Sequence, residues 1–306
     1  MFACLHAPDF LVQSVVRLDA ALRQQPVAIL DGPPPLQKVV ALNPRAREQG
    51  MYLGMTKSQA ELFAAKLCQR NRTQEAAASQ ALLDCAFAFS PRVEGVGENK
   101  GSVILDIDGL ERLHGDAESI GQALQQLGNT LGFELNVGIA ANPDAAALAA
   151  HGFSGITVVL PGLERERFAP LPIGILDLSI ELQETFRAWG IHTLQALADL
   201  PEIGLIERIG QEGKRLQTLA CGASQRPLIP KEPELKFEES LELEFPIELL
   251  EPLTFVLARL LQPLCARLAA RGLAAGTISL TLELEPERLP VQCDQSGQKY
   301  ELNNPQ

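Results

Sequence analysis

The sequence predicts an α/β chain in which short apolar strands alternate with helices. Four runs of apolar and β-branched residues have the length of strands, namely Phe2–Leu5, Pro26–Leu30, Ser102–Ile107 and Phe133–Ile139. The alanine-rich stretch Gln74–Phe89 has helical composition. With 306 residues and 46% hydrophobic content, the chain can bury more than one core. This alternation favours helices packed on a sheet.

The composition narrows the function classes. A net charge of −12 argues against a uniformly basic nucleic-acid binder, although it leaves room for a local basic face. The six cysteines show neither CxxC nor zinc-site spacing, so we expect mostly buried free thiols. Residues 1–10 lack the basic start and apolar run of a signal peptide, and no stretch reaches membrane-spanning length without charge. These features favour a cytoplasmic protein.

The first strand leads into HAPDF and a helical pattern over Leu11–Arg23. After the strand Pro26–Leu30, a proline-rich loop precedes a further strand, Lys38–Leu42. The polar stretch NPRAREQGM follows, and helix formers over residues 59–68 predict a helix that includes Ser58–Lys66.

The stretch Val93–Gly109, VEGVGENKGSVILDIDG, is the one around which the chain is organised. Its first half is turn-like, with several glycines, and its second half is a buried-strand pattern. Asp106 and Asp108 alternate with apolar residues, so we expect both carboxylates on one face of the strand. Acids at the edge of such a strand are where a two-metal nucleotide-transfer site would be sought.

The second half of the chain is mainly helical. Asp116–Gly132 predicts a helix before the strand Phe133–Ile139 and the segment VGIAANPDAAALAAHG. Leu160–Pro172 is predicted as a connector at a domain boundary. Three helices are then predicted, Leu182–Gly190, Thr193–Leu200 and Gly204–Cys221.

The C-terminal region alternates between strand and helix patterns. Lys236–Phe245 alternates weakly as a strand, Leu249–Arg271 has the pattern of a long amphipathic helix, and Thr277–Glu285 is a clean alternating strand. A polar tail ends at Gln306.

Taken in chain order, these motifs resemble those of Y-family, lesion-bypass DNA polymerases. The match is strongest in GIHTLQALADLP and LIERIGQEGKRLQTLACGASQRPL, which resemble the family's thumb, and Val93-Glu94 with Leu105-Asp106 match the two ends of its palm motif. The resemblance implies a right hand with palm, fingers, helical thumb and a partial little finger. The expected domains are residues 1–10 and 76–165 for the palm, 11–75 for the fingers, 166–230 for the thumb and 231–306 for an incomplete little finger.

The sequence departs from the family pattern where the family holds its metals. Aligning Gln25–Ile29 with the family motif puts His6 at the first metal-binding Asp and Pro8 at the second. Aligning the central stretch from its left end puts Asn99 and Lys100 at the catalytic Asp-Glu pair, and aligning it from the right puts Gly101 and Ser102 there. Compared with the family it resembles, the chain is therefore expected to hold no metal and no cofactor and to have no catalytic residue.

Other positions of the family pattern are kept or lost individually. Pro44 replaces a Tyr that contacts the triphosphate, and Pro143 and Ala147 replace two lysines. Arg47 and Asn142 remain as remnants of the nucleotide pocket. The family's hairpin glycines correspond to Leu178-Ser179-Ile180, so phosphate is harder to approach there. Candidate DNA contacts in the thumb are Gly210, Gly213, Lys214, Arg215 and Arg226.

In losing these residues, the chain resembles the ImuB-type branch of the family. Members of that branch lack catalytic residues and act as adaptors in damage-induced mutagenesis. The resemblance implies an adaptor, rather than an enzyme, in the translesion synthesis of the bacterial SOS response. Its implied partners are primer–template DNA, an error-prone replicative-type polymerase, a RecA-like accessory protein and the sliding clamp, without a membrane. No clamp-binding peptide is evident in the sequence.

Two alternatives stay open. An active polymerase would have to use displaced acids, for which the sequence offers Asp9, Glu98, Asp106 and Asp108. A protein-interaction module without DNA binding would agree with the net charge of −12 and the missing hairpin glycines.

Overall fold

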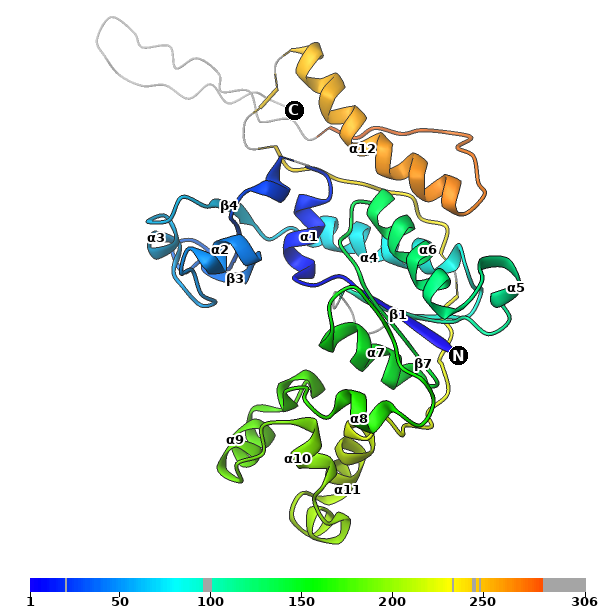
Figure 1. The fold of residues 1–306 in the computed structure, drawn as a ribbon. Helices are drawn as coiled ribbons and strands as arrows, with labels where there is room; N and C mark the ends of the chain where they lie inside the picture. Colours follow the sequence, from blue (N-terminus) through cyan, green and yellow to red (C-terminus); the bar gives the residue numbers. More distant parts are fainter. Residues whose placement is uncertain (20, 96–100, 233, 244–245, 248, 283–306) are drawn as a thin grey trace, which may run out of the picture.

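The computed structural model describes residues 1–282 except 20, 96–100, 233, 244–245 and 248. The predicted α/β class is confirmed, with two sheets and helices around them (Figure 1). The larger sheet has the order β5-β6-β1-β7-β8, with β1 Phe2–His6, β5 Val93–Gly95, β6 Ser102–Asp106, β7 Asn136–Ala140 and β8 Ile156–Val158. The smaller sheet has the order β3-β2-β4, with β2 Val27–Asp31, β3 Lys38–Leu42 and β4 Lys66–Gln69.

Helices cover both faces of the larger sheet. In Figure 1, α4 and α6 lie on one face and α7 lies on the other. We keep the names palm, fingers and thumb for the expected segments, whose boundaries stay predictions. The helices of palm and fingers are α1 Phe10–Val16, α2 Pro44–Glu48, α3 Lys57–Ala60, α4 Arg72–Phe87, α5 Glu111–His114, α6 Ala117–Thr130 and α7 Pro143–Gly152. The remaining helices are α8 Glu164–Phe168, α9 Ile180–Ala188, α10 Leu194–Ala198, α11 Glu202–Ala220 and α12 Leu250–Ala270, and short 3-10 turns span Leu22–Gln24 and Ile173–Leu176.

The central strand β1 separates two hydrophobic cores. Ala3 and Leu5 point toward α4 and α6, whereas Cys4 points toward α7, as the alternation of a strand requires. Burial raises the pKa of the Cys4 thiol to about 12, so it stays a neutral thiol as expected. The core on the α7 side continues without interruption into the thumb through the buried side chains of Phe168 and Phe186. Palm and thumb therefore share one core.

The fingers differ from the sequence prediction in two places. The helix expected over Leu11–Arg23 ends at Val16, and only a 3-10 turn follows. The helix expected over Ser58–Lys66 stops at Ala60, and Lys66–Gln69 is instead the strand β4. This strand pairs in parallel with β2 and supplies its second neighbour. The hydrogen bonds of the sheet thus outweigh the helical propensity of these residues.

The thumb contains the three predicted helices as α9, α10 and α11, each within a few residues of its expected bounds. Residues 160–172, expected to be a connector, also form α8, because Phe168 is fully buried in the shared core. Within α11, Gly210 has a φ of 71° and interrupts the helix with a kink. A left-handed φ of this kind favours glycine.

The C-terminal region confirms the predicted long helix, as α12, but not the predicted strands. The described residues of 236–243 and 277–282 have no ladder partner and are irregular, and 283–285 lie outside the described part. An alternating pattern needs a neighbouring strand to form a ladder, and none of the described segments supplies one. Among the described residues, α12 is long and apolar enough to cross a membrane, but it carries the charged residues Arg259 and Arg267. The exposed Cys265 on this helix is also an exception to the expected buried thiols.

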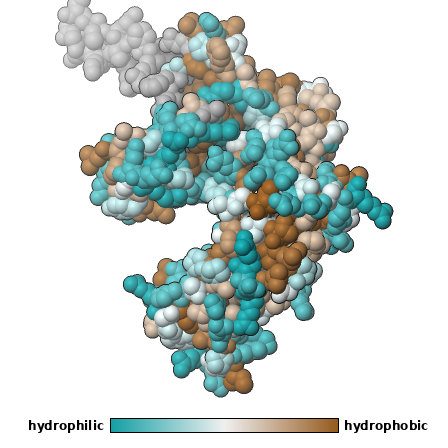
Figure 2. Space-filling model, viewed as in Figure 1, coloured by the Kyte–Doolittle hydropathy of each residue, from teal (hydrophilic) through white to brown (hydrophobic). Residues whose placement is uncertain are grey.

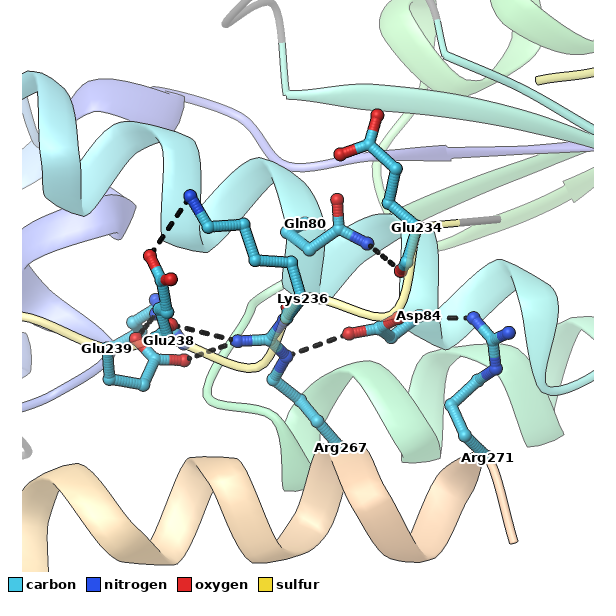
Figure 3. A network of polar contacts seen from close by, with 9 residues as sticks. Gln80, Asp84, Glu234, Lys236, Glu238, Glu239, Arg267 and Arg271 are labelled. Carbon is cyan, nitrogen blue, oxygen red and sulfur yellow. Dashed lines mark hydrogen bonds and ion pairs between the residues drawn. The ribbon is translucent and has the colours of Figure 1, made fainter. Parts of the chain in front are cut away.

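A buried network of charges holds α12 against the palm (Figure 3). Arg267 donates from Nε to Asp84 of α4 at 2.8 Å and from Nη1 to Glu239 at 3.2 Å. Glu239 also pairs with Arg17, which follows α1. The network therefore ties α12, the segment before it and the palm into one body.

Candidate functional site

Two histidines and one serine meet where strands β1 and β6 run side by side. His6, the last residue of β1, pairs in register with Ser102, the first residue of β6. The Nδ1 atom of His6 lies 2.9 Å from the Ser102 Oγ, and the Nε2 atom of His151 lies 2.8 Å from the same oxygen. The ring centroids of His6 and His151 are 4.1 Å apart. A hydroxyl can donate to one ring and accept from the other, so it joins the two imidazoles.

The helix α7 brings His151 to this cluster. Its first turn is capped by Asn142, whose side-chain oxygen accepts the backbone N–H of Ala145 at 2.8 Å. His151 lies in its last turn. His151 was not predicted as a site residue, because it lies 49 positions from Ser102 and belongs to no recognised motif. Its place at the end of the segment VGIAANPDAAALAAHG gave no signal that it would reach Ser102.

Burial sets the charge of the cluster. Burial of the His6 ring away from water lowers its pKa to about 4, and the nearby His151 lowers it further. A neutral His6 is therefore the stable form at neutral pH. Protonation would place a cation beside the second imidazole inside the sheet.

We expect the stability of the fold to decrease in mild acid because of His6. A histidine whose pKa is lower in the folded protein than its ordinary 6.5 binds a proton more readily when the chain unfolds. The contribution of His6 to the free energy of unfolding is complete above about pH 6.5 and is lost as the pH falls toward about 4. At about pH 5 the loss is at most about 2 kcal/mol. Urea unfolding at about pH 7.5 and about pH 5 measures it.

Two variants isolate this effect. His6→Gln should show a smaller loss of stability between the two pH values than the parent chain. His192→Gln, at an exposed histidine of the thumb, should keep the full loss. Equal losses in the parent chain and in His6→Gln would contradict the assignment.

The cluster is a poor fit for the two Mg²⁺ ions of a nucleotidyltransferase. Magnesium prefers carboxylate and other hard oxygen ligands, whereas this cluster offers two imidazoles and one hydroxyl. The described part of the chain holds no group of three or more His, Cys, Asp or Glu side chains arranged for a metal. Two of the alternative positions, Asn99 and Lys100, lie outside the described residues. Of the four candidate positions for the catalytic pair, the described ones are Gly101 and Ser102, and both lie beside the end of β1 that carries His6.

Gly101 and Pro8 have structural contacts at this site. Gly101 has a φ of 63°, and a Cβ atom there would lie 2.6 Å from the Cβ of Phe10, so only glycine fits. Its carbonyl oxygen accepts the backbone N–H of Ala7 at 2.8 Å. The carbonyl oxygen of Pro8 accepts the side-chain amide of Gln13 at 2.8 Å.

Two of the displaced acids, Asp106 and Asp108, lie away from His6. Asp106 pairs in register with Phe2, at the opposite end of β1 from His6. The two ends are four residue steps apart, which is about 13 Å. Asp106 accepts a hydrogen bond from Arg92 at 2.5 Å, and the Asp108 carboxylate lies 3.8 Å from the amino group of Met1. Glu98 lies outside the described residues.

Asp9 instead lines a pocket between palm and fingers. The pocket has a volume of about 290 Å³ and is bounded on the palm side by His6, Asp9 and Phe10 and on the fingers side by Val40 and Arg47. Both guanidinium Nη atoms of Arg47 donate to the Asp9 carboxylate, one of them at 2.8 Å. The hydrogen bonds to Asp9 raise the pKa of Arg47 above its ordinary value. Arg47, predicted as a remnant of a phosphate-binding site, is therefore already bound to a carboxylate.

Asn142, the other predicted remnant, has structural contacts. Besides capping α7, its side-chain amide donates to the carbonyl oxygen of Gly222 at 2.8 Å. It therefore links the palm to the end of the thumb.

The predicted DNA-contacting residues do not form one basic patch. Lys214 lies 2.7 Å from Glu202, and Arg215 lies 2.6 Å from Glu212, on the exposed surface of α11. Gly210 forms the kink of this helix, and Gly213 lies in its second half, where a Cβ would approach Leu205 and Ile209 side chains.

Arg226 bridges two acids of the palm, Asp144 and Glu94. Its Nε atom donates to Asp144 of α7 at 2.6 Å, and its Nη1 atom donates to Glu94 of β5 at 2.9 Å. Glu94 also accepts the backbone N–H of Ile229 at 2.8 Å. Arg226 therefore fastens the segment after the thumb to the palm.

Figure 2 shows a notch in the surface between the part of the chain with α2 and α3 and the part with α9 to α11. Residues 5–151 match the impB/mucB/samB family. Over 228 residues the chain is 28% identical to a protein named DNA polymerase IV from Dehalococcoides mccartyi strain CBDB1, which covers 71% of this chain and 56% of the relative. It is 26% identical over 230 residues to DNA polymerase IV of Moorella thermoacetica, covering 69% of this chain and 56% of that relative. The chain thus spans about half the length of these relatives.

Two solved structures share the arrangement of elements. The crystal structure of DinB from Sulfolobus solfataricus matches with a TM-score of 0.61 and 20% identity, over 76% of this chain and 70% of the other. The insertion ternary complex of Dbh DNA polymerase matches with a TM-score of 0.61 and 18% identity, over 74% of this chain and 69% of the other. At these identities the likeness concerns the fold.

Proposed function

We propose, starting from the Y-family DNA polymerase fold that this chain has, that it is a non-catalytic adaptor in DNA damage tolerance. In this role it would associate with primer–template DNA and recruit a separate enzyme for error-prone translesion synthesis. The observation that carries the proposal is the cluster of His6, Ser102 and His151 at the paired ends of β1 and β6.

The physical argument concerns charge. Two Mg²⁺ ions beside a triphosphate gather several positive charges, which carboxylate ligands must balance. Phosphoryl transfer relies almost entirely on this positioning and electrostatic stabilisation. A neutral His6 and a serine hydroxyl supply neither negative charge nor the ligands that Mg²⁺ prefers.

The proposed partners follow from the ImuB-type resemblance. They are an error-prone replicative-type polymerase, a RecA-like accessory protein and the sliding clamp, together with DNA. We place the protein in the bacterial cytoplasm, at the nucleoid when it is engaged. One structural neighbour is Dbh DNA polymerase in an insertion ternary complex, which supports the DNA part of this proposal.

An active lesion-bypass polymerase is the second candidate, and the names of the sequence relatives favour it. It would need several carboxylates around its metals, whereas Asp9 is the only carboxylate among the described residues that line the pocket with His6. The third candidate is an interaction module without DNA binding. The ion pairs of Lys214, Arg215 and Arg226 with acids of the same chain favour it.

Primer extension separates the first two candidates. With Mg²⁺ or Mn²⁺ and all four deoxynucleotides, we expect this chain to extend a primer at least about a thousandfold more slowly than the Dehalococcoides mccartyi relative assayed beside it. That factor is the size of effect expected when phosphoryl transfer loses a group that balances charge. Template-dependent extension that disappears in Asp106→Ala or Asp9→Ala would refute the adaptor role.

A salt series with labelled primer–template separates the first candidate from the third. If the protein contacts phosphates, its affinity should fall steeply as salt rises. Lys214→Gln combined with Arg215→Gln should lower the affinity. Arg112→Gln combined with Lys236→Gln changes the net charge equally at exposed positions outside the thumb and should leave the affinity unchanged. Absence of binding at low salt would favour the third candidate.

A further inference from the structure

The pocket between palm and fingers contains one pair of opposite charges. Of the described residues that line it, Arg47 is the only cation and Asp9 the only carboxylate. The other lining residues are apolar apart from His6, whose pKa of about 4 leaves it neutral at neutral pH. The charge that the pocket presents to a ligand therefore depends on whether Arg47 is paired.

The backbone at Asp9 is shaped for this contact. Asp9 precedes α1 and has φ 49° and ψ 44°, a left-handed conformation that is uncommon for residues other than glycine. An aspartate at this position usually accepts a hydrogen bond from the first turn of the helix. Here the carboxylate makes no such bond and is directed to Arg47 instead. Uncommon backbone conformations of this kind occur often at functional sites.

Arg47 is held in place from the fingers. It lies on α2, whose first turn is capped by the side chain of Asn43. The Asn43 amide also donates to the carbonyl oxygen of Gln25 at 2.7 Å, which ties the helix to the start of β2. The Arg47 side chain remains 47% exposed, whereas that of Asp9 is 25% exposed. A soluble anion can therefore reach the guanidinium, and the competing carboxylate is the less accessible partner.

We propose that Asp9 acts as a built-in competitor for anions at Arg47, so that the pocket binds a polyphosphate only when this ion pair opens. A guanidinium binds two oxygens of a carboxylate or of a phosphate with the same planar geometry, so the two ligands exclude each other. The inference deepens the proposed function, on which it rests, because a pocket blocked in this way matches a chain that recruits rather than synthesises.

The test compares binding of sodium tripolyphosphate to the full chain and to its variants by calorimetry. Asp9→Asn keeps the size of the side chain and tolerates the left-handed backbone, but it removes the negative charge. We expect it to bind tripolyphosphate about tenfold more tightly than the parent chain, which corresponds to about 1.4 kcal/mol. Asp9→Gly provides a second variant that is free of backbone strain at this position.

Two controls make the result specific. Asp108→Asn changes the net charge equally at an exposed position outside the pocket and should bind as weakly as the parent chain. Combining Asp9→Asn with Arg47→Gln should cancel the gain. Repeating the series with dATP shows whether a free polyphosphate or a nucleotide is the better ligand, because only the nucleotide can also contact the apolar lining.

The proposal is overturned if both Asp9 variants bind as the parent chain does, if Asp108→Asn gains as much, or if the gain survives loss of Arg47. Binding is measured without primer or metal. Primer extension by the parent chain would therefore refute the proposed adaptor role while leaving this binding result as it stands.

Discussion

Arg267→Ala is expected to lower the free energy of unfolding by about 3–5 kcal/mol. The Arg267 side chain is 0% exposed, as are the side chains of Asp84 and Glu239 that it contacts. Its Nη2 atom also donates to the carbonyl oxygen of Lys236 at 2.7 Å (Figure 3). Without the guanidinium, buried Asp84 would keep only the longer ion pair with Arg271, and Glu239 would keep only the pair with Arg17. Burial already raises the pKa of Asp84, and the arginine counteracts this.

Urea unfolding measures this effect as a shift of the midpoint at constant slope. Arg215→Ala is the matched control, because it removes the same side chain from an exposed pair with Glu212. We expect that control to change the unfolding free energy by less than about 1 kcal/mol. Replacing Arg267 by Met and Asp84 by Leu together should cost less than Arg267→Ala, since no charge of that pair is then stranded. Equal shifts for Arg267→Ala and Arg215→Ala would show that the network does not stabilise the fold.

Gly138→Ala is expected to destabilise the palm by about 2–3 kcal/mol or more. Gly138 lies in β7 directly beneath α7. A Cβ atom there would lie 2.2 Å from the carbonyl oxygen of Ala146 and 2.4 Å from the backbone nitrogen of Ala150. Both are backbone atoms of the helix, so no side-chain rotation relieves the overlap. The helix would have to move away from the sheet.

The comparison is with Gly204→Ala in α11, where a Cβ would meet nothing within 4 Å. That change should raise stability by up to about 1 kcal/mol, because alanine is the better helix former.

Displacement of α7 should also separate His151 from Ser102 in the Gly138 variant. Proton NMR of the histidine rings in that variant should then show the pKa of His6 rising from about 4 toward its ordinary value. A Gly138 variant as stable as the Gly204 variant would contradict this packing.

The sequence predicted best the elements whose signal is local. Strands β1, β2, β3, β6 and β7 and helices α4, α6, α9, α10 and α11 follow from apolar periodicity and helix-forming composition. Strand β4 was missed, because its residues favour a helix and only pairing with β2 makes it a strand. The alternating pattern of Thr277–Glu285 shows the reverse, since its described residues alternate without a ladder partner.

The candidate site was predictable only in part. Alignment to the family motif selected His6 and Ser102, and the structure pairs them in register. It could not select His151, whose contribution depends on the position of α7. Arg226 was chosen as a DNA contact for its charge and its place in the thumb motif, and its ion pairs with Glu94 and Asp144, from distant parts of the chain, were not foreseen. Ion pairs between distant residues leave no periodic signal.

The position of β1 in the larger sheet has a consequence for how the chain folds. Phe2 pairs with Asp106 on one side and with Ala140 on the other, so both neighbours of the strand come from far along the sequence. Closing such long loops reduces chain entropy before the sheet supplies any hydrogen bonds, and domains with many contacts of this kind fold slowly. The palm should therefore assemble late and cooperatively, after the locally formed helices of the thumb.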